Sequence, residues 1–245
     1  MTVLHLEASM LVVLFVLIPL VSWLTWPRSR ARLMAGQRLA VYMRTIAWQW
    51  LLTLALLSGW LVLAPHWRLG LTLEGGVVWF ALAVSLAVAG VLMAAQRRAA
   101  SDPAAREAVH AQLDPLLFML PHDKRELVAY VALSATAAIC EEILYRGFLF
   151  ELLADRGGAL LALLGSTLAF TLAHLYQHPQ GVVRVAAVGL VLGLVFWLSG
   201  SLWPCIVLHF AVDVSSGHLA YRVHQSTTDN APVATSTESA RGDIS

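Results

Sequence analysis

The chain has 245 residues, of which 59% are hydrophobic and only 13% are charged, and its formal net charge is +1. A soluble domain is about half apolar and about a quarter charged, so this chain lacks the polar residues needed to cover a water-facing surface. A net charge this close to zero gives no sign of a nucleic-acid-binding face, because such faces are strongly basic. The composition therefore predicts an all-α protein that is embedded in a lipid bilayer.

Seven apolar stretches are long enough, at roughly 17–25 residues each, to cross the hydrocarbon core as helices. They cover residues 8–26, 39–64, 77–95, 127–152, 159–177, 182–199 and 202–222. The first stretch is expected to be a membrane anchor rather than a cleaved leader, because Glu7 precedes it and the nearest basic cluster follows it. The sequence therefore predicts a polytopic membrane protein with about seven transmembrane helices.

The basic residues gather in two loops, and this pattern sets the expected orientation. The two groups are Arg28, Arg30, Arg32 and Arg38 after the first stretch, and Arg97, Arg98, Arg106, Lys124 and Arg125 after the third. Because cytoplasmic loops are enriched in Arg and Lys, both groups are expected inside, with the N-terminus outside and the C-terminus in the cytoplasm. Fifteen Arg against one Lys is typical of a GC-rich bacterial genome, so the expected location is the bacterial cytoplasmic membrane.

We expect three parts along the chain. They are three transmembrane helices with an interfacial loop helix over residues 1–122, a catalytic four-helix membrane core over 123–224, and a disordered polar tail over 225–245. The loop helix is expected to begin at Asp102, with Pro103 in its first turn. Asp123 and Glu126 resemble a capping box at the start of the fourth stretch. Cys140 and Cys205 form no C-x-x-C pair and are interpreted as small buried apolar residues.

Ionisable side chains are costly inside a membrane span and often mark a functional site. The first three stretches carry few, and those lie near the ends of the stretches. The later stretches carry more, and among them are Glu141, Glu142, Arg146, His174, His209 and Asp213. The chemistry is therefore expected in the C-terminal half.

The spacing of the acids and Arg146 on the fourth stretch indicates different tasks for Glu141 and Glu142. Glu142 lies four residues before Arg146, which is the favourable order for an ion pair on one helix face. Glu141 points about 100° away around the helix and has no obvious partner there. A buried carboxylate without a partner can act as a general base or acid. Taken alone, the Glu142–Arg146 pair could equally be a structural link between helices.

The histidines come from two other stretches. Phe170 lies one turn before His174, where its ring could shield the imidazole from lipid, and His209 lies one turn before Asp213. A carboxylate beside an imidazole can fix its tautomer. Each feature also has a structural interpretation, as an interhelical hydrogen bond or a satisfied pair. Ionisable groups at mid-depth in three separate helices favour one shared site around a wet cavity.

Three motifs occur in order on successive membrane stretches: EExxxR at residues 141–146, FxxxH at 170–174 and HxxxD at 209–213. Together they resemble the CAAX-protease and bacteriocin-processing (CPBP) family of glutamic intramembrane endopeptidases, which includes the type II CAAX prenyl proteases. The resemblance covers roughly residues 123–218. Asp213 stands where the prenyl proteases typically have Asn.

The resemblance implies a peptidase whose substrate is a membrane-anchored protein or peptide. Glu141, assisted by His174, would deprotonate a water molecule for attack on the scissile carbonyl. His209, with Asp213 either orienting it or itself protonated, would stabilise the oxyanion. The catalytic groups would be held in position by Glu142, Arg146 and Phe170.

Several alternatives stay open at this point. No cofactor is expected, but Glu141, His174 and His209, with Asp213 as a possible fourth ligand, could instead bind zinc. The sequence has no HExxH, GxGD or GxSG motif, which are the motifs of the zinc, aspartyl and rhomboid-like intramembrane proteases. It therefore fits these three classes less well. A transporter or an immunity protein is the non-enzymatic alternative.

Overall fold

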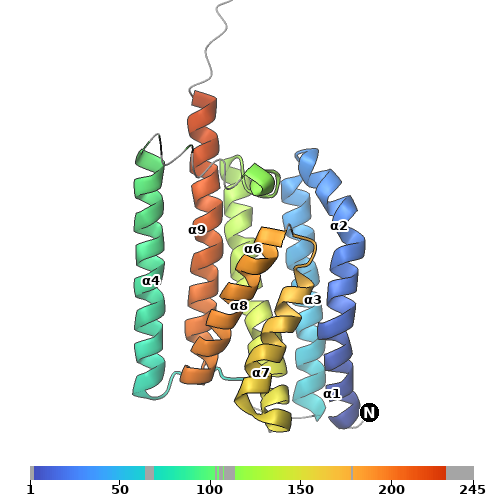
Figure 1. Ribbon diagram of the computed structural model, residues 1–245. Helices are drawn as coiled ribbons and strands as arrows, with labels where there is room; N and C mark the ends of the chain where they lie inside the picture. Colours follow the sequence, from blue (N-terminus) through green and yellow to red (C-terminus); the bar gives the residue numbers. More distant parts are fainter. Residues whose placement is uncertain are drawn as a thin grey trace, which may run out of the picture.

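The computed structural model describes residues 3–63, 69–102, 104, 107, 114–177 and 179–229, and within these residues it contains helices but no strand. The elements are α1 (Val3–Val12), η1 (Val13–Leu17), α2 (Ile18–Met34), α3 (Arg38–Leu63), α4 (Gly76–Ser101), η2 (Asp114–Met119), α6 (Lys124–Glu142), η3 (Ile143–Phe150), α7 (Glu151–Ala173), α8 (Pro179–Ser199) and α9 (Leu202–Asp229). Figure 1 shows the long helices standing side by side as an upright bundle. The predicted all-α class is confirmed for the described part of the chain.

Within the described part of the chain, five helical stretches are long and apolar enough to cross a membrane. They are Leu4–Met34, Arg38–Val62, Gly76–Ala99, Lys124–Ala173 and Pro179–Ser199. The 50-residue stretch contains two of the predicted spans, and its helix is interrupted at Gly157 and Gly158. Gly158 has φ +77°, a conformation that favours glycine. The described residues therefore contain five candidate spans against about seven predicted, and the 50-residue stretch accounts for part of the difference.

Helix α9 accounts for another part of this difference. It coincides with the predicted span 202–222 and contains the polar residues His209, Asp213 and His218, and it is not among the five stretches. The helix also continues to Asp229, so residues 225–229 are helical instead of forming the start of a polar tail. The remainder of the predicted tail, residues 230–245, lies outside the described residues.

Of the two predicted helix caps, the one at Asp123 is present, and the one at Asp102 would start a helix that lies mostly outside the described residues. The Asp102 carboxylate accepts a hydrogen bond from the Ala104 amide at 3.0 Å. The Asp123 carboxylate accepts from the Glu126 amide at 2.8 Å and starts α6. The Glu126 carboxylate in turn accepts from the His122 amide at 2.8 Å. These bonds satisfy amide groups at the helix start that have no intrahelical partner.

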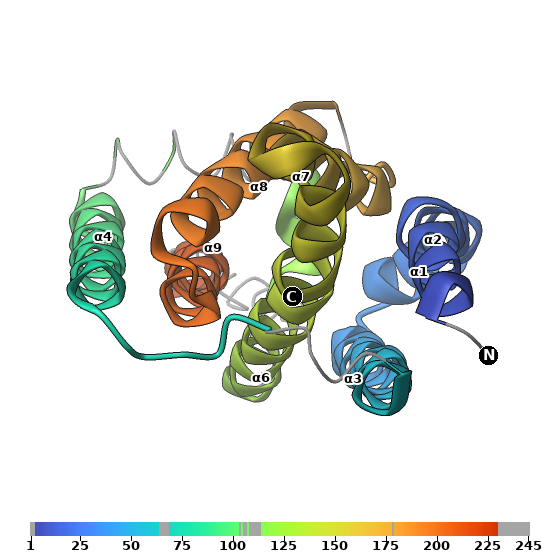
Figure 2. The same cartoon turned by 90° about the horizontal axis from the view of Figure 1, so that it is seen from below.

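Helices α6 to α9 form the middle of the bundle. Seen from below, α4 lies at one end of the molecule and α1 and α2 lie at the other (Figure 2). Helix α4 packs against α9, α9 against α6, α6 against α3, and α7 against α8. The α7–α8 turn lies lower than the upper ends of α6 and α9 (Figure 1).

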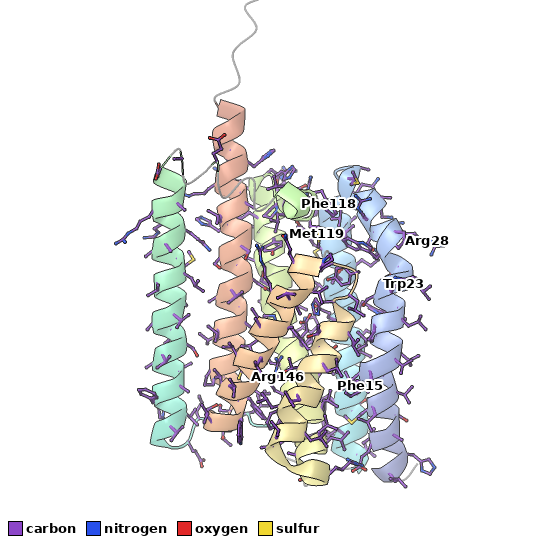
Figure 3. All side chains as sticks on the ribbon, viewed as in Figure 1. Phe15, Trp23, Arg28, Phe118, Met119 and Arg146 are labelled. Carbon is purple, nitrogen blue, oxygen red and sulfur yellow. The ribbon has the colours of Figure 1, made fainter. Side chains whose placement is uncertain are left out.

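The buried and exposed side chains match this arrangement. Phe148, Leu149 and Leu152 are fully buried at the centre of the main apolar cluster. Many large apolar side chains point outward instead, and Val62 and Phe80 are more than two-thirds exposed. Figure 3 shows Trp23 and Arg28 projecting from the outer side of α2, whereas Arg146 lies within the bundle. An apolar exterior of this kind suits contact with lipid.

Candidate active site

Glu141 and Glu142 are the last two residues of α6, and Arg146 lies in the π-helix η3 that follows directly. A π-helix has a wider turn than an α-helix, and such segments occur frequently at functional sites. The remaining predicted residues come from the end of α7, where His174 is the C-cap, and from α9, which carries His209 and Asp213. Three separate helical segments thus supply the site.

The predicted ion pair between Glu142 and Arg146 is present. An Arg146 nitrogen lies 2.9 Å from Glu142 Oε1, and both side chains are completely buried. A second guanidinium nitrogen donates to the Gly189 carbonyl at 2.8 Å, which joins η3 to α8. The guanidinium carbon also lies 4.9 Å from the centre of the Phe170 ring. The cation is therefore held by a carboxylate, a carbonyl and an aromatic face in a site that is closed to bulk solvent.

Glu142 also holds His209. His209 Nδ1 lies 2.7 Å from the same Glu142 Oε1 atom, across 67 residues of sequence. The Asp213 carboxylate, by contrast, lies 3.8 Å from His209 Nε2, which is beyond hydrogen-bond distance. The direct hydrogen-bond partner of the His209 ring is therefore Glu142, and Asp213 approaches the ring only as a longer charge contact. The Glu142 carboxylate accepts, so Nδ1 carries the donated proton.

Glu141 faces the other nitrogen of the same ring. Glu141 Oε2 lies 3.9 Å from His209 Nε2, and its side chain is 15% exposed, whereas that of Glu142 is fully buried. Its other oxygen, Oε1, accepts a hydrogen bond from Gln49 Nε2 at 2.8 Å. Gln49 belongs to α3, and sequence analysis missed it because only ionisable groups in the apolar stretches were considered.

His174 is held by its own helix. Its Nδ1 atom lies 2.8 Å from the Phe170 carbonyl oxygen, one turn earlier. A carbonyl oxygen can only accept, so Nδ1 must be the donor. In the neutral ring, Nε2 is then left as the acceptor, which is the tautomer that a proton-accepting histidine needs.

Phe170 lies among the polar groups of the site. Its side chain is 3% exposed, and its ring centre lies 4.8 Å from that of His174 and 6.0 Å from that of His209. The ring also packs edge-on against Tyr145. Phe170 therefore does more than shield His174 from lipid, the role predicted for it. Its ring lies beside both imidazoles and also packs against the Arg146 guanidinium.

The zinc alternative gains no support from the geometry. Among the described residues, which include every predicted site residue, no group of three or more His, Cys, Asp or Glu side chains is arranged to hold a metal ion. Glu142 engages Nδ1 of His209, which leaves Nε2 as the ring atom that could bind zinc.

Comparison with known proteins yields one family. Residues 123–215 match the family described as type II CAAX prenyl endopeptidase Rce1-like. The match begins at the Asp123 cap of α6 and includes all of the predicted site residues, but it excludes α1 to α4 and therefore Gln49. No curated protein and no solved structure matches the chain.

Proposed function

We propose that the chain is a peptidase of the intramembrane protease family described as type II CAAX prenyl endopeptidase Rce1-like and acts on protein substrates, because residues 123–215 match that family. From this premise, we propose that it is an endopeptidase that hydrolyses peptide bonds of membrane-associated proteins or peptides, with Glu141 as the base that activates water. The observation that carries the proposal is the arrangement around His209 Nε2. This atom faces the carboxylates of Glu141 at 3.9 Å and Asp213 at 3.8 Å, while the opposite nitrogen is anchored on Glu142.

Glu141 is the better placed of the two glutamates to act as the base. Glu142 is committed to Arg146 and His209, so its Oε1 lone pairs are already engaged. Glu141 is partly exposed and directs one oxygen toward His209. A separation of 3.9 Å is too long for a direct hydrogen bond, but it suits a water molecule or a substrate oxygen that contacts both groups.

The proposed reaction proceeds through a tetrahedral intermediate. Glu141 takes a proton from water as the water oxygen attacks the scissile carbonyl carbon, and the carbonyl oxygen becomes an oxyanion. His209 donates a hydrogen bond from Nε2 to this oxyanion, which requires a proton on both ring nitrogens because Nδ1–H already serves Glu142. When the intermediate collapses, Glu141 returns its proton to the leaving nitrogen and the C–N bond breaks.

His174 and Asp213 complete the proposed site. His174 presents Nε2 as an acceptor, and this atom would orient the attacking water for Glu141. Asp213 lies on the same side of His209 as Glu141, and its side chain is 35% exposed. We assign it to the oxyanion side, where it would donate in its protonated form.

We further propose that the chain crosses the bacterial cytoplasmic membrane seven times. In this arrangement the Lys124–Ala173 stretch crosses twice, with its turn at Gly157–Gly158, and α9 provides the last crossing beside the site. The N-terminus and the end of α9 lie at opposite ends of the bundle, as an odd number of crossings requires (Figure 1). The basic residues of α2 and α4 lie toward the end of the bundle that would face the cytoplasm.

The proposed function can be tested by peptide cleavage in proteoliposomes. We expect purified protein to cleave a peptide tethered to the membrane by a lipid or an apolar segment, and to cleave the same peptide poorly when it is free in solution. Glu141→Ala should abolish cleavage. Glu7→Ala is the matched control, because it removes an acid whose partner, Arg156, lies outside the site. Cleavage retained by Glu141→Ala would contradict the proposal.

A further inference from the structure

The site contains a contact from outside the family domain. Gln49 Nε2 donates to Glu141 Oε1 at 2.8 Å, across 92 residues of sequence, and α3 precedes the matched segment 123–215. This is a side chain hydrogen bond from another helix to the proposed base. From the geometry we infer that Gln49 is a positioning residue for Glu141, so that the N-terminal helices complete the active site. The inference rests on the proposed function, since it assigns a task relative to that base.

The two oxygens of the Glu141 carboxylate have different surroundings. Oε1 is bound by the Gln49 amide, and Oε2 faces His209 Nε2 at 3.9 Å. A hydrogen bond to one oxygen limits rotation of the carboxylate about its last torsion, which is otherwise a broad and soft one. Gln49 thereby keeps Oε2 directed at the place where water and the scissile carbonyl must meet. A displacement of about 1 Å in such a group can cost about 100-fold in rate.

Helix α3 is held in place by contacts that do not involve Gln49. Trp50 Nε1 donates to Thr136 Oγ1 of α6 at 3.2 Å. Farther up the helix, Tyr42 donates from its hydroxyl to the Met119 carbonyl at 2.6 Å, and Arg38 Nε donates to the Phe118 carbonyl at 3.1 Å. A substitution of Gln49 alone is therefore expected to leave α3 packed against α6.

The test compares Gln49→Leu with Trp50→Phe in the proteoliposome cleavage assay. Leu has a similar size but no amide, so Glu141 loses its partner; Trp50→Phe removes a hydrogen bond between the same two helices without touching Glu141. We expect Gln49→Leu to lower kcat by about 10-fold or more, which is part of what a positioned general base contributes, with KM within about twofold of the wild type. Trp50→Phe should leave kcat unchanged and lower only the melting temperature.

A second variant and a thermal measurement complete the test. Gln49→Glu keeps the shape but sets a second acid against Glu141, so kcat should fall at least as far as in Gln49→Leu. In melting curves, Gln49→Leu should shift the melting temperature of the wild type but not that of Glu141→Ala, where the partner is already missing.

Each outcome decides one claim. Wild-type kcat in Gln49→Leu, together with an inactive Glu141→Gln variant, would overturn the positioning role and leave the proposed function standing. Equal losses of kcat in Gln49→Leu and Trp50→Phe would mean that Gln49 contributes only to the packing of the helices. This result would also overturn the inference. If Glu141→Gln is fully active, the proposed function fails, and the thermal comparison alone still decides whether Gln49 and Glu141 interact.

Discussion

Glu142 and His209 share a 2.7 Å hydrogen bond between a completely buried carboxylate and a ring on another helix. The same oxygen of Glu142 is bound by Arg146, so the ion pair and the imidazole form one unit. The arginine offsets the charge of the carboxylate, and the carboxylate sets which nitrogen of His209 faces Glu141. A pair that looks structural in the sequence is therefore connected to the proposed chemistry through this one atom.

The first prediction concerns Arg146. Arg146→Ala leaves the Glu142 charge buried with only His209 as a partner, so the free energy of unfolding should fall by about 3–5 kcal/mol. Arg156→Ala is the matched control, because its ion pair with Glu7 is partly exposed and should contribute about 0–1 kcal/mol. Thermal unfolding in detergent measures both. A loss of stability no larger for Arg146→Ala than for Arg156→Ala would contradict the buried pair.

Combining Glu142→Gln with Arg146→Met extends this prediction from stability to activity. No lone charge remains in the double variant, so much of the stability should return. Cleavage should stay low, because the neutral amide holds His209 more weakly than the carboxylate does. Recovery of both stability and cleavage would show that Glu142 has no role beyond its pairing with Arg146.

The second prediction concerns Asp213. Its carboxylate is not hydrogen-bonded to His209 Nε2 at 3.8 Å, so its proposed task is to donate toward the oxyanion. Asp213→Asn keeps a donor of the same size and should retain activity within about 10-fold. Asp213→Leu removes the donor and should lower kcat by about 100-fold or more, the usual loss for an oxyanion donor. If Asp213→Asn is as inactive as Asp213→Leu, the ionised carboxylate is the functional form.

The third prediction concerns the close approach of α8. A Cβ atom at Gly189 would lie 3.1 Å from Phe170 Cδ1 and 3.7 Å from a guanidinium nitrogen of Arg146. Gly189→Ala should push the Phe170 ring and the Gly189 carbonyl away from Arg146, with a loss of about 1–3 kcal/mol. Gly90→Ala in α4 is the control, because a Cβ atom at that position would meet nothing within 4 Å and alanine favours the helix. Equal melting temperatures for the two variants would contradict this account of α8 packing.

The fourth prediction concerns metal dependence. Because the proposed base activates water without a Lewis acid, cleavage should survive exhaustive treatment with chelator, and elemental analysis should find less than one zinc per chain. Loss of activity in chelator with recovery on addition of zinc would instead support zinc on Glu141, His174 and His209.

The sequence predicted the parts of the site that depend on local spacing. Arg146 follows Glu142 by four positions, and this spacing brings the two side chains together even though the helix widens to a π-helix after Glu142. The Asp123 cap likewise depends on only three residues of chain. These features follow from helix geometry, so no knowledge of the packing was needed.

The contacts between helices could not be predicted in the same way. The Gln49–Glu141 and His209–Glu142 bonds join residues 92 and 67 positions apart, and which helix faces which depends on packing. Gln49 is uncharged, so the cost of burying it is smaller and its signal in the sequence is weaker than that of a buried acid. The prediction that Asp213 orients His209 relied on i, i+4 spacing alone and overlooked a stronger partner on α6.

The most direct test of the proposed mechanism is the rate of cleavage by Glu141→Gln under single-turnover conditions. This change keeps the size of the side chain, its place beside Gln49 and its approach to His209, and it removes only the ability to take a proton. The variant should fold and bind the tethered peptide like the wild type, while the cleavage rate should fall by about 100-fold to 10,000-fold, the usual contribution of a general base. A Glu141→Gln variant that cleaves the peptide at the wild-type rate would contradict the assignment of Glu141 as the catalytic base.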